Sequence, residues 1–225
     1  MNKFHTNYRY TNRQTKSKYV WLKYQSILSG YILDVGGDEG HLKQYLPSDA
    51  KYWAIDLGGH PDSVVNLEKG SPPFPDNTFD CVLCLDVLEH VDNIHDVFDE
   101  LCRISKKYVI ISLPNPWASF AHVMLFGNKT PHQPLKFYGL PPEKPRDRHK
   151  WFFSNEEAKQ FITYRAAKNY MQVVQMDNHG SDKNRHIGKR LLLNILGSIL
   201  HQTRNIKLAD FFAGTLWAVL EKNSG

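Results

Sequence analysis

The chain has few cysteines and no long apolar run, and each of these absences excludes a class of protein. Of the three cysteines, Cys81 and Cys84 lie inside one apolar stretch. Residues three apart on a strand face opposite sides, so buried reduced thiols explain this pair better than a redox or zinc motif. No apolar run reaches the roughly 20 residues that a membrane-spanning helix needs. Residues 1–18 are polar and basic, unlike a signal peptide, and we therefore expect a cytoplasmic protein.

Positive charge exceeds negative charge in this sequence, and the formal net charge is +5. The cationic residues gather near the N-terminus and in the second half of the chain, at Lys3, Arg9, Arg13, Lys16, Lys18, Lys23, Arg146, Arg148, Lys150, Lys183, Arg185, Lys189 and Arg190. Such clusters attract anionic substrates, membrane surfaces or nucleic acids, and a solvated basic face explains them equally well. No RNA-binding module is visible, and residues 84–87 lack an Asn-Pro-Pro-Tyr tetrad, which argues against nucleic acid as the partner.

A glycine-containing turn between two apolar runs is the most informative feature of the chain. Residues 31–40 read Tyr-Ile-Leu-Asp-Val-Gly-Gly-Asp-Glu-Gly, and a second apolar run ends on Asp56 sixteen residues later. This order predicts a strand, a turn, a helix and a strand tipped with a carboxylate, where a nucleotide-like cofactor lies across the strand ends. Gly36 and Gly40 let the backbone come close to a ligand, and Asp56 can accept hydrogen bonds from two ribose hydroxyls.

The carboxylates in this turn indicate which of two kinds of cofactor the turn favours. Asp34, Asp38 and Glu39 would repel a pyrophosphate, but they suit a ligand with an ammonium group, such as S-adenosylmethionine (SAM). The stretch resembles motif I of the class I SAM-dependent methyltransferases, D-x-G-x-G-x-G, with Asp38 in place of the middle glycine. We expect Asp38 to take a left-handed backbone conformation, which Asp adopts at modest cost. The alternative is an ordinary α/β turn with an acidic rim.

A second stretch strengthens the resemblance. Residues 72–91 read PPFPDNTFDCVLCLDVLEHV and are similar to a segment of the type 11 small-molecule methyltransferases. The two motifs occur in the family's order, within residues 31–91 of the chain. The resemblance implies SAM as cofactor, held by Asp34, Gly36, Gly37, Asp38 and Gly40 at the methionine end, Asp56 at the ribose, Leu57 at the adenine, and Asn66, Leu67 and Leu85 nearby.

Alternating strand and helix patterns predict an α/β fold with a doubly wound, mostly parallel, Rossmann-like sheet. We expect seven strands, the last of them antiparallel and at the sheet edge, over residues 31–35, 52–55, 60–67, 79–85, 108–113, 171–176 and 215–220. Helices are expected over residues 15–28, 40–45, 94–104 and 154–169, the last with a capping box that begins at Ser154. We interpret residues 1–225 as a single domain with an N-terminal cap helix within residues 1–29.

Two insertions interrupt this pattern. Residues 114–153 are rich in aromatic residues and proline, and loops of such length are usually lids or binding loops, so we expect an acceptor-binding lid. Residues 146–153 resemble the H-x-x-F-F-T stretch of bacterial sugar and lipid methyltransferases. In residues 185–210, apolar residues crowd more than one helical face and basic residues flank them. We expect this helical insertion to pack on the sheet or at a homodimer interface, or alternatively to contact a membrane or a lipid-linked substrate peripherally.

Methyl transfer from a sulfonium depends mainly on holding the acceptor in line with the methyl group. A hydroxyl acceptor must also lose a proton, so O-methylation calls for a nearby base. His149 is the first candidate and His90 the second. Arg148 and Lys150 flank His149 and are expected to lower its pKa by repulsion between like charges.

These features favour a cytoplasmic class I SAM-dependent methyltransferase that acts on a small-molecule or glycan acceptor, anionic in one version of this hypothesis. The best-supported reaction is O-methylation of a small, saccharide or lipid-linked saccharide acceptor. An RNA methyltransferase, a quinone or other lipid methyltransferase, and a non-catalytic SAM-binding module remain alternatives. The sequence shows no metal-ligand motif, and SAM is the one cofactor that it predicts.

Overall fold

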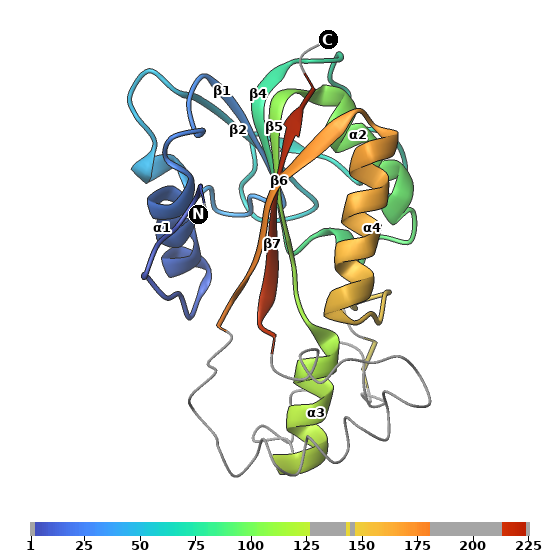
Figure 1. Cartoon of the computed structure of the whole chain (residues 1–225). Helices are drawn as coiled ribbons and strands as arrows, with labels where there is room; N and C mark the ends of the chain where they lie inside the picture. The colour runs from blue at the N-terminus through green and yellow to red at the C-terminus, as the bar shows by residue number, and fades with distance from the viewer. Residues whose placement is uncertain (1–2, 127–142, 145–146, 181–212, 224–225) are drawn as a thin grey trace.

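The computed structural model describes residues 3–126, 143–144, 147–180 and 213–223. In this part of the chain one seven-stranded sheet has the order β3-β2-β1-β4-β5-β7-β6 (Figure 1). Its strands are β1 (Tyr31–Val35), β2 (Lys51–Asp56), β3 (Ser63–Val64), β4 (Phe79–Leu85), β5 (Ser105–Leu113), β6 (Met171–His179) and β7 (Thr215–Lys222). β7 runs antiparallel to both of its neighbours, whereas the first five strands are parallel. The predicted Rossmann-like sheet with an antiparallel last strand is confirmed.

Helices cover both faces of the sheet, as Figure 1 shows, with α1 on one side and α2 and α4 on the other. The helical elements are α1 (Arg13–Tyr24), the 3₁₀ turns η1 (Lys43–Tyr45) and η2 (Leu88–His90), α2 (Ile94–Ile104), α3 (Pro116–Phe126) and α4 (Asn155–Lys168). None of them, within the described residues, combines the length and apolar character that crossing a bilayer needs. The helical insertion predicted over residues 185–210 lies outside the described residues, as does much of the predicted lid, which begins as α3.

The core consists of two apolar clusters, one on each face of the sheet. On β7, Leu216, Ala218 and Leu220 join the cluster under α2 and α4, whereas Trp217 and Val219 join the cluster under α1. Side chains alternate between the faces of a strand, so a strand that is apolar at every position must be covered on both sides. This requirement explains the three-layer architecture.

The cysteines follow the same alternation. Cys81 belongs to the cluster under α1 and Cys84 to the cluster on the other face. Both are free and buried, as is Cys102, and burial raises the pKa of the Cys102 thiol to about 12. The interpretation of these residues as buried reduced thiols is confirmed.

Three local predictions were wrong. The strand predicted over residues 60–67 is only the two-residue β3, Ser63–Val64. The helix predicted over residues 40–45 is only the 3₁₀ turn η1, because Pro47 follows closely and the preceding Leu46 is extended (φ −72°, ψ 150°). The last strand does not lie at the sheet edge, since β7 pairs with both β5 and β6. β6 takes the edge instead, which suits its polar residues, whereas β7 is buried along most of its length.

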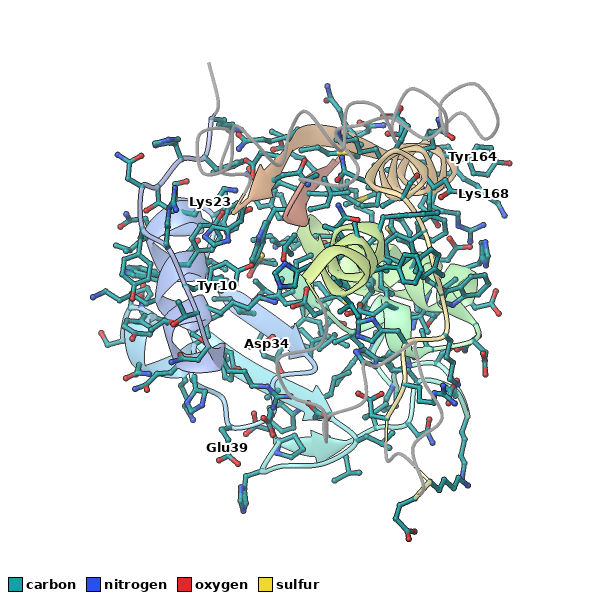
Figure 2. The ribbon with its side chains drawn as sticks, turned by 90° about the horizontal axis from the view of Figure 1, so that it is seen from below. Tyr10, Lys23, Asp34, Glu39, Tyr164 and Lys168 are labelled. Carbon is teal, nitrogen blue, oxygen red and sulfur yellow. The ribbon has the colours of Figure 1, made fainter. Side chains whose placement is uncertain are left out.

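The predicted start of α4 is confirmed. The Ser154 hydroxyl accepts from the Glu157 N–H at 3.1 Å, and the Glu157 carboxylate accepts from the Ser154 N–H at 2.7 Å. Tyr164 and Lys168 project from the outer side of this helix (Figure 2), and the Tyr164 side chain is exposed. The predicted cap helix starts at Arg13, earlier than expected, because Asn12 forms a capping box with Thr15.

Candidate functional site

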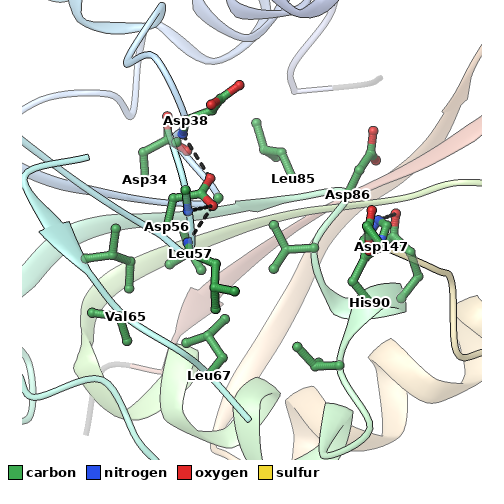
Figure 3. Close-up of a pocket in the computed structure, with 18 of the residues that line it drawn as sticks. Asp34, Asp38, Asp56, Leu57, Val65, Leu67, Leu85, Asp86, His90 and Asp147 are labelled. Carbon is green, nitrogen blue, oxygen red and sulfur yellow. Dashed lines mark hydrogen bonds and ion pairs between the residues drawn. The ribbon is translucent and has the colours of Figure 1, made fainter. Parts of the chain in front are cut away.

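A cavity of about 1130 Å³ lies at the carboxyl ends of β1, β2 and β4 (Figure 3). The residues predicted from the sequence that line it are Asp34, Gly36, Gly37, Asp38, Asp56, Leu57, Asn66, Leu67, Leu85, His90 and His149. Gly40 lies outside this lining and belongs to the turn, with φ at +63°. The strand ends thus bring together residues from two sides, here named the glycine-turn side (residues 34–67) and the histidine side (residues 89–90 and 147–149).

The glycine turn brings the backbone to the edge of the cavity. Gly36 has φ at +78°, and its N–H donates to the Ile55 carbonyl at 2.8 Å. A Cβ at Gly36 would lie 2.3 Å from a methyl group of Val87, so no side chain fits there. Asp38 has φ at +46°, which confirms the left-handed conformation expected from the sequence. Its side chain forms an ion pair with Arg13.

Asp34 is a buried carboxylate at the end of β1. Burial raises its pKa from 3.8 to about 6, although the Tyr52 hydrogen bond and the charge of Lys16 act in the opposite direction. The Tyr52 hydroxyl donates to the Asp34 Oδ2 at 2.7 Å. A cationic group placed against Asp34 would stabilise its ionised form.

Asp56 is held in a fixed orientation at the end of β2. Its Oδ1 accepts from the Leu57 N–H at 2.6 Å, and its Oδ2 accepts from the Asp38 N–H at 3.0 Å. The Gly58 N–H adds a longer bond to Oδ1 at 3.3 Å. Leu57 follows with a side chain that is 63% exposed and lines the cavity, so an apolar surface adjoins the oriented carboxylate.

The N-terminal helix contributes to the site in a way that the sequence reasoning missed. Lys16 donates to the Asp86 Oδ2 at 2.7 Å and to the Ser112 hydroxyl at 3.1 Å, and Arg13 reaches Asp38. Burial acts to raise the pKa of Asp86, but Lys16 and the Ser112 hydroxyl outweigh it and lower the pKa. The one available clue was the spacing of Arg13 and Lys16, which places both cations on one helix face.

The histidine side joins η2 to the segment before α4. The His90 Nδ1 lies 2.6 Å from the Asp147 Oδ1, and the His90 Nε2 lies 3.6 Å from the Glu89 Oε1. The rings of His90 and His149 meet edge to face, with centroids 4.6 Å apart. The two histidines that the sequence offered as separate candidates are therefore neighbours, and the buried Glu89 is a further member that the sequence reasoning missed.

Lys150 and Trp151 fasten this segment to η2. The Lys150 N–H donates to the Glu89 carbonyl at 2.8 Å, and the Trp151 Nε1 donates to the Val91 carbonyl at 2.7 Å. The Lys150 ammonium pairs with Glu68 and with Asp92, the latter at 2.7 Å. The expectation that Lys150 repels a proton from His149 thus loses part of its basis, since two carboxylates balance that charge.

Comparison with known proteins gives a family and a fold. A family model described as a methyltransferase domain matches residues 9–174. A SAM-dependent methyltransferase from Archaeoglobus fulgidus is 13% identical, with a TM-score of 0.55 over 94% of this chain and 95% of that one. One from Clostridium acetobutylicum is 11% identical, with a TM-score of 0.57 over 95% and 93% of the chains.

Magnesium protoporphyrin IX methyltransferase from Synechocystis PCC 6803, solved with bound SAH, is 15% identical, with a TM-score of 0.53 over 93% of this chain and 83% of that one. No curated protein matches the chain. At these identities the solved structures show a shared fold, and the family model carries the assignment.

Proposed function

The chain belongs to the methyltransferase-domain family and is a SAM-dependent methyltransferase, and we propose that it methylates a hydroxyl group of a small, saccharide or lipid-linked saccharide acceptor. The observation that supports this acceptor class is the polar wall of the cavity formed by Glu89, His90 and His149. A hydroxylated acceptor can hydrogen-bond to such groups. An apolar quinone would desolvate them without replacing their bonds to water, which costs free energy.

The glycine-turn side offers groups that are complementary to the functional groups of SAM. The buried Asp34 can accept from an ammonium group, the oriented Asp56 can accept from the ribose hydroxyls, and Leu57 offers an apolar surface for the adenine. When bound, SAM supplies an electrophilic methyl group. The work of the chain is to orient the reactants, and effective molarities for well-oriented groups account for about 7–11 kcal/mol of a barrier.

The histidine side is the proposed acceptor side. A hydroxyl acceptor there would lose a proton, and a positioned base contributes about 10²- to 10⁴-fold in rate. His149 remains the first candidate for that base and His90 the second, and both line the cavity that Asp34 and Asp56 also line. Their roles remain predictions, as does the role of residues 114–153 as an acceptor lid.

Methyl transfer from radiolabelled SAM into a cell extract tests the acceptor class. We expect the label in glycans or glycolipids, insensitive to nuclease and released by glycoside hydrolysis. The Asp56→Ala variant is the matched control and should transfer little label at a SAM concentration far below saturation. Label in nuclease-sensitive material would instead identify an RNA methyltransferase, and label in sugar-free lipid would identify a lipid methyltransferase. SAM binding without any transfer would indicate a binding module.

A further inference from the structure

Three potential metal ligands from two distant segments meet on the histidine side. Glu89 and His90 come from η2, and His149 comes from the segment before α4. One ligand atom of each lies within 4.8 Å of the ligand atoms of the other two. Glu89 is 1% exposed, and a carboxylate buried so deeply is stabilised by positive charge placed against it.

Asp147 determines which nitrogen of His90 is available to a ligand. The Asp147 Oδ1 lies 2.6 Å from the His90 Nδ1, where an ionised carboxylate would accept the proton of that nitrogen. With the proton on Nδ1, the Nε2 of a neutral ring would offer its lone pair toward Glu89, whose Oε1 lies 3.6 Å away. Two electron-pair donors facing each other at this distance suit a cation that binds both. A carboxylate that orients a ligating histidine through its other nitrogen is the usual arrangement in metal sites.

We propose that Glu89, His90 and His149 bind one divalent transition-metal cation, and that this cation binds the acceptor hydroxyl. Two imidazoles and one carboxylate suit Zn²⁺, Mn²⁺, Co²⁺ or Fe²⁺ better than Mg²⁺ or Ca²⁺, which prefer oxygen ligands alone. Three protein ligands leave coordination positions open, as in catalytic metal sites. The second half of the proposal rests on the proposed function, because it takes the acceptor to be a hydroxyl.

The cation would take over the task otherwise given to a protein base. A hydroxyl bound to a divalent cation becomes more acidic. Its O–H bond breaks, the electron pair stays on the oxygen, and the proton passes to solvent water. His90 and His149 then act as neutral ligands, and Asp147 acts as a positioning residue for His90.

The segment that carries His149 is held where a preformed site needs it. The Lys150 N–H, which follows His149 in the chain, donates to the carbonyl of Glu89, itself a proposed ligand, at 2.8 Å. The Lys150 ammonium contacts Glu68 and Asp92, and the Trp151 indole binds the Val91 carbonyl. These contacts join the segment to η2 at several points, so the ligands are oriented by their neighbours before a cation arrives.

Titration of untagged, chelator-treated protein with Mn²⁺, followed by the electron paramagnetic resonance of the free ion, tests the first half of the proposal. We expect one equivalent to bind, and Co²⁺ to give the absorption bands of a nitrogen- and oxygen-ligated ion. The variants Glu89→Gln and His149→Ala should lose this binding. Asp147→Asn should weaken it about 10- to 100-fold, as losses of outer-shell partners do. His5→Ala, an exposed histidine outside the cluster, is the matched control.

SAM binding by each variant shows that it is folded. No stoichiometric binding of Mn²⁺, Co²⁺ or Zn²⁺ to the parent, or equal binding by Glu89→Gln, would overturn the proposal and leave His90 as an imidazolium between Glu89 and Asp147. Methyl transfer separates the two proposals. Transfer to a hydroxyl that is unaffected by chelation would refute the role of the cation alone, whereas cation binding without any hydroxyl methylation would refute the acceptor class alone.

Discussion

The glycine-turn side of the cavity is built from one continuous stretch of chain, whereas the histidine side joins segments 57 residues apart in the sequence. The first side is fixed by backbone groups, since N–H donors orient Asp56. The second side is fixed by side-chain contacts such as those of Lys150. The difference indicates that the proposed cofactor side is determined by local geometry and that the proposed acceptor side forms only when the fold is complete. Changes on the two sides should therefore separate cofactor affinity from turnover.

Replacing His149 should give the largest effect. His149→Ala should lower turnover by roughly 10²- to 10⁴-fold, because the hydroxyl then loses the group that assists its deprotonation. SAM affinity, measured by calorimetry, should change little, since the proposed cofactor contacts lie on the other side. A parallel loss of SAM affinity would contradict the proposed separation of cofactor binding and turnover between the two sides. A role of His149 as a base and a role as a metal ligand predict the same fall in turnover. Adding Mn²⁺ or Co²⁺ to the chelated parent distinguishes them, because only the ligand role predicts that the metal restores turnover.

Asp34→Asn should weaken SAM binding and stabilise the ligand-free protein. The folded-state pKa of about 6 lies above the ordinary value of 3.8, so the folded state binds the proton more tightly. Stability from this group is present below pH 4 and is lost as the pH rises to about 6, a loss of about 3 kcal/mol. Asn avoids this cost, so at pH 7.5 the melting temperature should rise by about 5–10 °C. An unchanged or lower melting temperature would contradict the assignment of a strained buried carboxylate.

Asp56→Ala should weaken SAM binding by on the order of 1.5–3 kcal/mol, the loss expected for hydrogen bonds to a charged group. Turnover at saturating SAM should stay within a few-fold of the parent, in contrast with His149→Ala. Calorimetry and initial rates measure the two quantities separately. If Asp56→Ala binds SAM as tightly as the parent, the ribose assignment is wrong.

The smallest effect concerns the partner of Asp34. Tyr52→Phe removes a hydrogen bond that lowers the Asp34 pKa, so the pKa should rise above about 6. SAM affinity should then begin to fall at a higher pH than in the parent, because the ammonium needs the ionised carboxylate. The charged groups that influence the pKa of Asp34 are Lys16 and Asp56, and the Tyr52→Phe substitution changes neither of them. If the pH midpoint for the loss of SAM affinity is the same as in the parent, Tyr52 does not influence the pKa of Asp34.

The glycine-turn side could be predicted from the sequence more fully than the histidine side. Asp34, Asp38 and Asp56 occupy neighbouring strand ends, and the local pattern of glycines and apolar runs was enough to predict where they lie. The short turn η1 differs from the helix predicted there because Pro47 favours an extended conformation for the preceding Leu46.

Long-range partners could not be predicted in the same way. Nothing local to His90 indicates that it contacts Asp147 or that His149 lies beside it, because these contacts join segments 57 residues or more apart in the sequence. The position of β7 between β5 and β6 is equally non-local. Its continuous apolar sequence was the available clue, since an edge strand rarely needs cover on both faces.

Two cations of α1, Arg13 and Lys16, have a consequence for the rate at which the product of the cofactor would leave the proposed site. Arg13 and Lys16 both line the cavity, and their ion pairs tie α1 to Asp38 and Asp86. The Arg13 side chain is 77% exposed and the Lys16 side chain 14%, so dissolved salt screens the first pair far more than the second. A higher ionic strength should therefore weaken the Arg13–Asp38 pair and speed cofactor exchange. The Lys16–Asp86 pair should persist under the same conditions. Stopped-flow exchange measured across a salt series would show α1 opening from its N-terminal turn.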